Sequence, residues 1–145
     1  MSMFNGFHAS ASALTAQRLR MDVVSSNMAN AETTRGELVD GEWQPYRRKM
    51  VSLSPNQSNQ SFQSFLNKEL GGVKVSAIEQ DTTPFKMVFQ PDHPDANEEG
   101  YVEMPNVDPL REMVDLMGAT RSYEANVTAL NASKNMLLKT LEIGK

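Results

Sequence analysis

The sequence predicts an α+β fold, in which long helices at the two ends pair as a coiled coil and a small β-rich middle domain lies between them. Near both ends, apolar residues recur at alternating spacings of three and four. Such spacing keeps one face of a helix turned toward a partner helix. Pro and Gly, in contrast, are concentrated between positions 36 and 105. We therefore expect three regions, 1–35, 36–105 and 106–145.

The first predicted helix covers about residues 3–30 and, apart from Gly6, contains no Gly or Pro. Its stripe consists of Phe4, Phe7, Ala11, Leu14, Arg18, Met21, Ser25 and Met28. Asn side chains end helices well, because they tolerate left-handed geometry and compete for backbone hydrogen bonds. We expect Asn27, Asn30, Thr33 and Thr34 to set the turn into the middle region.

Pro and Gly divide residues 36–105 into short segments, which excludes a long helix there. The candidate strands are 46–53, 73–79 and 85–89, of which 73–79 shows an imperfect alternation of apolar and polar residues. Residues 54–64 form a polar stretch of low complexity, for which we predict a loop.

The last predicted helix begins cleanly, because Asp108 is a good N-cap and Pro109 suits the first helical position. It runs to about residue 143, which is roughly 50 Å of helix. Gly118 either allows close helix approach or is a tolerated weak position. The stripe consists of Met113, Leu116, Thr120, Tyr123, Val127, Leu130, Lys134, Leu137 and Leu141.

The apolar residues of the two stripes are the candidate interface. We expect Leu14, Met21, Val24 and Met28 to pair with Val127, Leu130, Leu137 and Leu141. The remaining candidates for assembly contacts are Met113, Leu116 and Tyr123. A seam of this length favours a protein that assembles over one that catalyses.

Composition excludes several other classes of protein. A formal charge of −4 argues against a general nucleic-acid binder. No apolar run is long enough to span a membrane, and the first residues lack the pattern of a cleavable secretory signal. The absence of Cys excludes disulfides and thiol chemistry.

One segment has the composition of a binding site. Asp92–Glu99 places His93 among several carboxylates, which suits a divalent cation, but its two prolines and Asn97 also define a turn. The basic run at 46–49 suits either phosphate contact or pairing with neighbouring acids. No nucleotide-binding or nucleophile motif is present. We therefore expect no catalytic residue, no metal site and no cofactor.

Four blocks resemble a known family. The segment 16–37 (AQRLRMDVVSSNMANAETTRGE) resembles the N-terminal helix and Asn-rich signature of bacterial flagellar rod and hook proteins. Residues 45–51, 93–108 and 112–144 are similar to the matching blocks of proximal-rod proteins, in the same order.

The resemblance implies a structural subunit of the proximal rod, in the basal body that crosses the periplasm. Its implied partners are itself, the other proximal and distal rod proteins, the adaptor to the inner-membrane ring and the flagellar type III export apparatus. It also implies export without a cleaved signal peptide, and terminal helices that form an inner tube around the export channel. Two alternatives remain: a free-standing helical-hairpin binding module that never polymerises, and a metal protein that uses the His93 turn.

Overall fold

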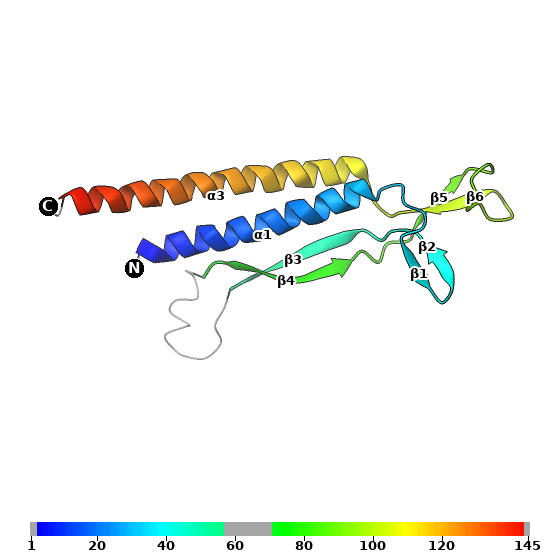
Figure 1. Ribbon diagram of the computed structural model, residues 1–145, viewed down its shortest axis with the longest axis horizontal. Coiled ribbons are helices and arrows are strands. Elements are labelled where there is room, and N and C mark those ends of the chain that lie inside the picture. Colours follow the sequence, from blue (N-terminus) through cyan, green and yellow to red (C-terminus); the bar gives the residue numbers. More distant parts are fainter. Residues whose placement is uncertain (1–2, 57–70, 144–145) are drawn as a thin grey trace. The chain divides into compact units, whose positions relative to one another are not determined.

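The computed structural model describes residues 3–56 and 71–143. In chain order the elements are α1 (Met3–Ala29), β1 (Glu37–Val39), β2 (Glu42–Gln44), β3 (Lys49–Pro55), β4 (Val73–Gln80), β5 (Lys86–Phe89), β6 (Tyr101–Met104) and α3 (Pro109–Ile143) (Figure 1). The predicted α+β class is confirmed: along the described part of the chain, a long helix precedes and another follows three small two-stranded sheets. Most of the predicted polar loop, residues 57–64, lies outside the described residues.

The chain divides into two compact units, which are described separately. Unit 1 comprises Met1–Met21, Val51–Ala77 and Met117–Lys145. Unit 2 comprises Asp22–Met50 and Ile78–Leu116. Each long helix therefore contributes one segment to each unit.

The start of α3 and the end of α1 both lie where the local sequence predicts them. Asp108 caps α3, because its Oδ1 accepts a hydrogen bond from the Leu110 N–H at 3.1 Å and its carbonyl accepts one from the Glu112 N–H at 3.0 Å. At the end of α1, the backbone N–H of Asn30 and its side-chain Nδ2 both donate to the Ser26 carbonyl, at 3.1 and 2.8 Å. The predicted helices, about 3–30 and 109–143, agree with α1 and α3 to within a residue.

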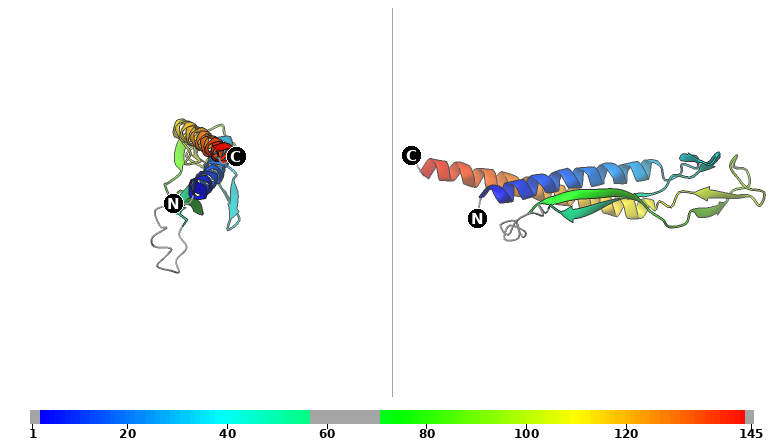
Figure 2. Two further views of the ribbon diagram at one scale, coloured as in Figure 1. Left: turned by 90° about the vertical axis from the view of Figure 1, so that its left-hand side faces the viewer. Right: turned by 90° about the horizontal axis from the view of Figure 1, so that it is seen from below.

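In unit 1 the α1 segment lies between α3 and the β3–β4 pair (Figures 1 and 2). On the strand side, Ser12 Oγ accepts a hydrogen bond from the Val73 N–H at 3.0 Å. A Cβ at Gly72 would overlap that oxygen, so any larger residue there would have to displace the Ser12 hydroxyl from this hydrogen bond. On the helix side, the Thr120 hydroxyl donates to Met21 Sδ at 3.5 Å. At Gly118 a Cβ would meet no heavy atom of the described residues within 4 Å, so no close approach among those residues depends on it.

The candidate strands 46–53, 73–79 and 85–89 correspond to β3, β4 and β5. The sequence prediction lacked β6, which pairs with β5 in antiparallel register from Lys86↔Met104 to Phe89↔Tyr101. It also lacked the β1–β2 hairpin, whose turn residues Asp40 and Gly41 have φ angles of 53° and 90°. Positive φ at both positions is the geometry of a type I′ turn, which Asp-Gly favours.

Burial differs sharply between the units. Among the described residues of unit 1, only Ala16 and Ala119 are buried. Unit 2 holds eleven buried residues, which include Val102 and Val107 and also four polar or charged ones, Asn27, Arg48, Asn106 and Glu112. No helix in the described part of the chain has the length and hydropathy to cross a membrane.

Candidate functional site

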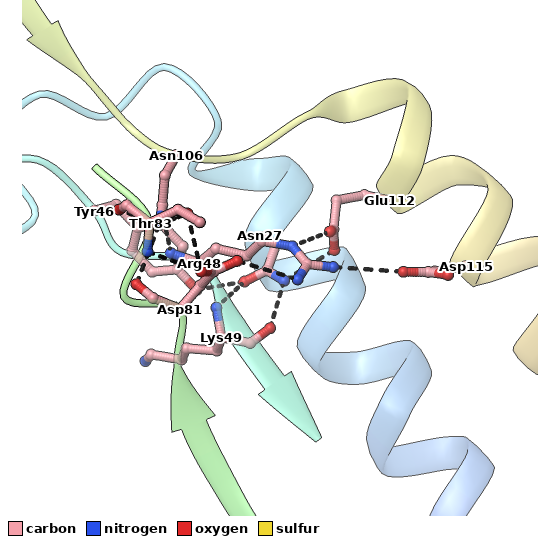
Figure 3. A network of polar contacts seen from close by, with 9 residues as sticks. All are labelled: Asn27, Tyr46, Arg48, Lys49, Asp81, Thr83, Asn106, Glu112 and Asp115. Atoms are coloured by element: carbon pink, nitrogen blue, oxygen red, sulfur yellow. Dashed lines mark hydrogen bonds and ion pairs between the residues drawn. The ribbon is translucent and has the colours of Figure 1, made fainter. Parts of the chain in front are cut away.

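The most organised polar site of unit 2 is centred on Asn27, in the last turn of α1 (Figure 3). The side chain is fully buried. Its Nδ2 donates to the Lys49 carbonyl oxygen at 2.8 Å and to Glu112 Oε2 at 2.9 Å. Its Oδ1 accepts from the Lys49 N–H at 2.9 Å and from the Tyr46 hydroxyl at 3.0 Å. These four bonds use both donors and both acceptor positions of the amide. Asn27 therefore bonds both the N–H and the carbonyl of Lys49, the first residue of β3, as the backbone of a paired strand does.

Arg48 carries the second part of the site. Its side chain is buried, and Nε donates to Glu112 Oε1 at 2.6 Å. The other two nitrogens reach Asp81 Oδ2 at 3.5 Å and Asp115 Oδ2 at 3.4 Å. Glu112 has no exposed surface, and its two oxygens are taken by Arg48 and Asn27. Removing one partner of such a buried pair costs about 3–5 kcal/mol, because the other charge stays buried without compensation.

Asn106 closes the site from the connection that leads into α3. Its Oδ1 accepts from the Arg48 N–H at 2.8 Å. Its Nδ2 lies within hydrogen-bonding distance of the Asp81 carbonyl at 3.2 Å and of the carbonyl and hydroxyl oxygens of Thr83 at 3.1 and 3.0 Å. Hydrogen bonds from the Thr83 N–H and hydroxyl, helped by the charge of Arg48, lower the pKa of the Asp81 carboxyl below its ordinary value. The site thus joins α1, β3, the segment after β4 and α3.

A second polar cluster follows α1. Thr33 donates its hydroxyl to Asn30 Oδ1 at 3.3 Å, and the Thr33 N–H donates to the Asn30 carbonyl at 3.2 Å. The Thr34 hydroxyl and the Arg35 Nε each donate to the Asp95 carboxylate at 2.8 Å. The Arg35 guanidinium, followed by the Thr34 hydroxyl, lowers the pKa of Asp95. This cluster ties the segment after α1 to the loop between β5 and β6.

The structure places the four predicted turn residues in these two clusters. Asn30 and Thr33 bond to each other within the turn, and Thr34 reaches the β5–β6 loop. Asn27 lies one turn earlier and binds β3 and α3.

The segment Asp92–Glu99, whose composition suits either a divalent cation or a turn, forms a turn held by hydrogen bonds. His93 Nδ1 accepts the Asp95 N–H at 3.1 Å, and the Asp95 carboxylate is occupied by Thr34 and Arg35. Within residues 3–56 and 71–143, no group of three or more His, Asp or Glu side chains is arranged to hold a metal ion.

The predicted apolar stripe of α3 coincides with the buried face at every second position. Leu116, Tyr123, Leu130 and Leu137 are half-buried. On the same helix Glu112 and Ala119 are buried, and Asn126 and Ser133 are half-buried. At the remaining positions of the predicted stripe, Met113, Thr120, Lys134 and Leu141 are exposed, whereas Val127 is half-buried. On α1, Val24 is buried, and Leu14, Met21 and Met28 are half-buried. A pattern built on apolar residues missed Glu112 and Ala119, since one is charged and the other is small.

Two protein-family profiles match the chain, and both describe rod proteins of the flagellar basal body. The profile described as "Flagella basal body rod protein" matches residues 7–35, and the one described as "Flagellar basal body rod FlgEFG protein C-terminal" matches residues 98–143. The first match contains Asn27 and the second contains Glu112, whereas Arg48 lies outside both.

Relatives of similar length extend this likeness over the whole chain. The chain is 60% identical over 152 residues to the flagellar basal-body rod protein FlgC of Bacillus subtilis, covering 100% of both. It is 45% identical over 145 residues to FlgC of Escherichia coli O157:H7, again covering 100% of both. The FlgC of Borreliella burgdorferi is 41% identical over 153 residues, covering 99% of this chain and 98% of its own. The chain belongs to the FlgC family of flagellar basal-body rod proteins and is a structural subunit of the rod.

Proposed function

We propose that this subunit lies in the proximal part of the rod, where copies stack helically into a drive shaft that transmits torque and surrounds the export channel. The terminal regions, 1–35 and 106–145, form the inner tube, and region 36–105 faces outward. The subunit contacts other copies, the neighbouring proximal and distal rod proteins and the adaptor to the inner-membrane ring. It leaves the cytoplasm through the flagellar type III export apparatus, without a cleaved signal peptide, and it catalyses no reaction.

The observation that supports assembly best is the exposed apolar surface of α3. Eight large apolar side chains of this helix are about half or more exposed: Leu110, Met113, Val114, Met117, Met136, Leu138, Leu141 and Ile143. Burial of apolar surface contributes roughly 25 cal/mol per Å², so neighbouring subunits that cover this helix gain a large driving force. Met113 and Leu141 belong to the predicted assembly interface, and within this chain they are 49% and 70% exposed.

The test is complementation of a Bacillus subtilis strain that lacks its own FlgC. We expect the unsubstituted chain to restore swimming and complete basal bodies. Leu141→Asp is expected to abolish both, because it places a charge in an apolar contact between subunits. Since Leu141 is exposed, the free energy of unfolding of the purified variant should stay within about 0.5 kcal/mol of that of the unsubstituted chain.

Thr128→Asp is the matched control, because Thr128 is an exposed polar residue of the same helix. It should swim normally. Normal swimming of Leu141→Asp would contradict the proposed interface. If the unsubstituted chain restores no motility and behaves as a protease-resistant monomer, the free-standing binding module becomes the better description.

A further inference from the structure

Charge is divided unevenly between the two units. Among the described residues of unit 1, six are Lys or Arg and two are Glu. Unit 2 is described completely and contains six Lys or Arg and fifteen Asp or Glu. The modest overall charge of −4 therefore conceals a basic unit and a strongly acidic one.

Most of the carboxylates of unit 2 are available to a partner. Four of them pair with Arg35 or Arg48 of the same unit, namely Asp81, Asp95, Glu112 and Asp115. The other eleven are all exposed, and no ion pair joins them to the part of the chain that is described: Asp22, Glu32, Glu37, Asp40, Glu42, Glu79, Asp92, Glu98, Glu99, Glu103 and Asp108.

A concave site lies within this acidic surface. It has a volume of about 240 Å³ and is lined by Trp43 of β2 and by Met87, Tyr101 and Glu103 of the β5–β6 hairpin. We call it the hairpin notch. Trp43 and Met87 are 57% and 53% exposed, so both side chains offer apolar surface that a partner can cover. Arg35 also lines the notch, but its charge is compensated by Asp95.

The notch combines aromatic faces with a carboxylate, which is the environment that a cationic side chain with a long apolar stem prefers. Unit 1 offers such a side chain on α3. Arg121 is exposed, and no ion pair joins it to another described residue. Met117, which is 50% exposed, lies four residues earlier and therefore on the same side of the helix. Met117 and Arg121 are therefore complementary to the notch: the apolar Met117 can cover Met87 and Trp43 while the guanidinium of Arg121 pairs with the carboxylate of Glu103.

We propose that the hairpin notch of one copy binds the Arg121 surface of a second copy of this chain. The proposal rests on the function proposed above and adds the contact that orders the subunits. Two different surfaces meet in such a contact, so each added copy uses one of them and leaves the other unoccupied for the next copy. Contacts of this kind build open filaments when they do not close into a ring. Opposite charges on the two surfaces also disfavour notch-to-notch pairing, because like charges repel.

Disulfide trapping tests the contact directly, because the chain contains no Cys. Purified full-length Met87→Cys and Met117→Cys, which keep Glu103 and Arg121, are mixed and gently oxidised. We expect the mixed dimer to exceed by about tenfold the yield from Met87→Cys mixed with Lys139→Cys, in which the second cysteine lies farther along the same helix. The excess should fall in about 0.5 M salt, where charges are screened within a few ångströms. Trapping at the control level, or Met87→Cys dimers forming as readily as mixed ones, would overturn the proposal.

Charge exchange gives a second readout in the complemented strain. Glu103→Arg and Arg121→Glu are each expected to reduce swimming severely, and the chain that carries both substitutions should recover it. Lys74→Glu reverses an exposed charge of unit 1 that no ion pair joins to another described residue; it lies outside the contact, so this variant should swim normally. If the unsubstituted chain swims and the double variant is as defective as the single ones, the notch contact is wrong while the rod function stands.

Discussion

Unit 2 and unit 1 are stabilised in different ways. Unit 2 buries Asn27, Arg48, Asn106 and Glu112 in one network and satisfies their polar atoms within the chain. Unit 1 buries only Ala16 and Ala119 among its described residues and leaves several large apolar side chains of α3 exposed.

The difference indicates which part of the subunit depends on its neighbours. A buried polar network of this kind specifies one arrangement, because every alternative leaves a charge or amide unpaired. Exposed apolar surface specifies no single arrangement within the subunit, and it gains free energy only when another chain covers it. We therefore expect unit 2 to be formed before assembly and unit 1 to be completed by it.

The largest expected effect comes from removing the carboxylate at the centre of unit 2. Glu112→Ala should lower the free energy of unfolding by about 3–5 kcal/mol, because Arg48 then stays buried without its closest partner and Asn27 loses an acceptor. Denaturant unfolding followed by circular dichroism measures this. Asp115→Asn is the matched control, since Asp115 is half-exposed and its oxygen lies 3.4 Å from Arg48. Equal losses in the two variants would contradict the central role of Glu112.

Hydrogen exchange of the free subunit compares the units directly. Amide protons of α3 beyond residue 124 should exchange at least about tenfold faster than the N–H groups of Arg48 and Lys49, because local opening costs less where few contacts are buried. The two reference amides donate to Asn106 and Asn27. Equal protection in both units would show that unit 1 is complete before assembly.

The smallest expected effect concerns pH and the cluster after α1. The pKa of Asp95 is lowered in the folded chain, chiefly by Arg35 and then by Thr34. Its contribution to stability is therefore present above the ordinary Asp value of about 3.9 and is lost as the pH falls through the lower folded value. Thermal unfolding between about pH 5 and pH 3 should depend less on pH in Asp95→Asn than in the unsubstituted chain. An unchanged pH dependence would exclude the Asp95 cluster as a contributor.

Local signals were sufficient for the long elements. Asp108, Pro109 and the absence of Pro from the following 34 residues predict α3 almost to the residue, because capping and propensity act within a few positions. The β1–β2 hairpin was missed although Asp40-Gly41 is a strong turn signal. Its strands have three residues each, and all of these except Gln44 are exposed, so no apolar alternation accompanies that signal.

The polar centre could not be predicted in the same way. From the sequence, Asn27 was predicted to help end the first helix, and Arg48 was one member of the basic run at 46–49. Their shared partner, Glu112, lies 85 residues from Asn27 and 64 from Arg48. A charged residue is normally exposed, and only a partner brought close by the fold makes its burial favourable.

For the residues that the structure describes, the sequence by itself determined the two helices, their ends and three of the six strands, and it also carried the likeness to flagellar rod proteins. These follow from periodicity, caps and contiguous motifs, all of which act locally along the chain. The tertiary structure decided which face of α3 is buried and that Asn27, Arg48, Asn106 and Glu112 form one site. It also brought Trp43 to the notch beside Glu103. Burial and pairing depend on residues distant in sequence, and only the folded chain brings them together.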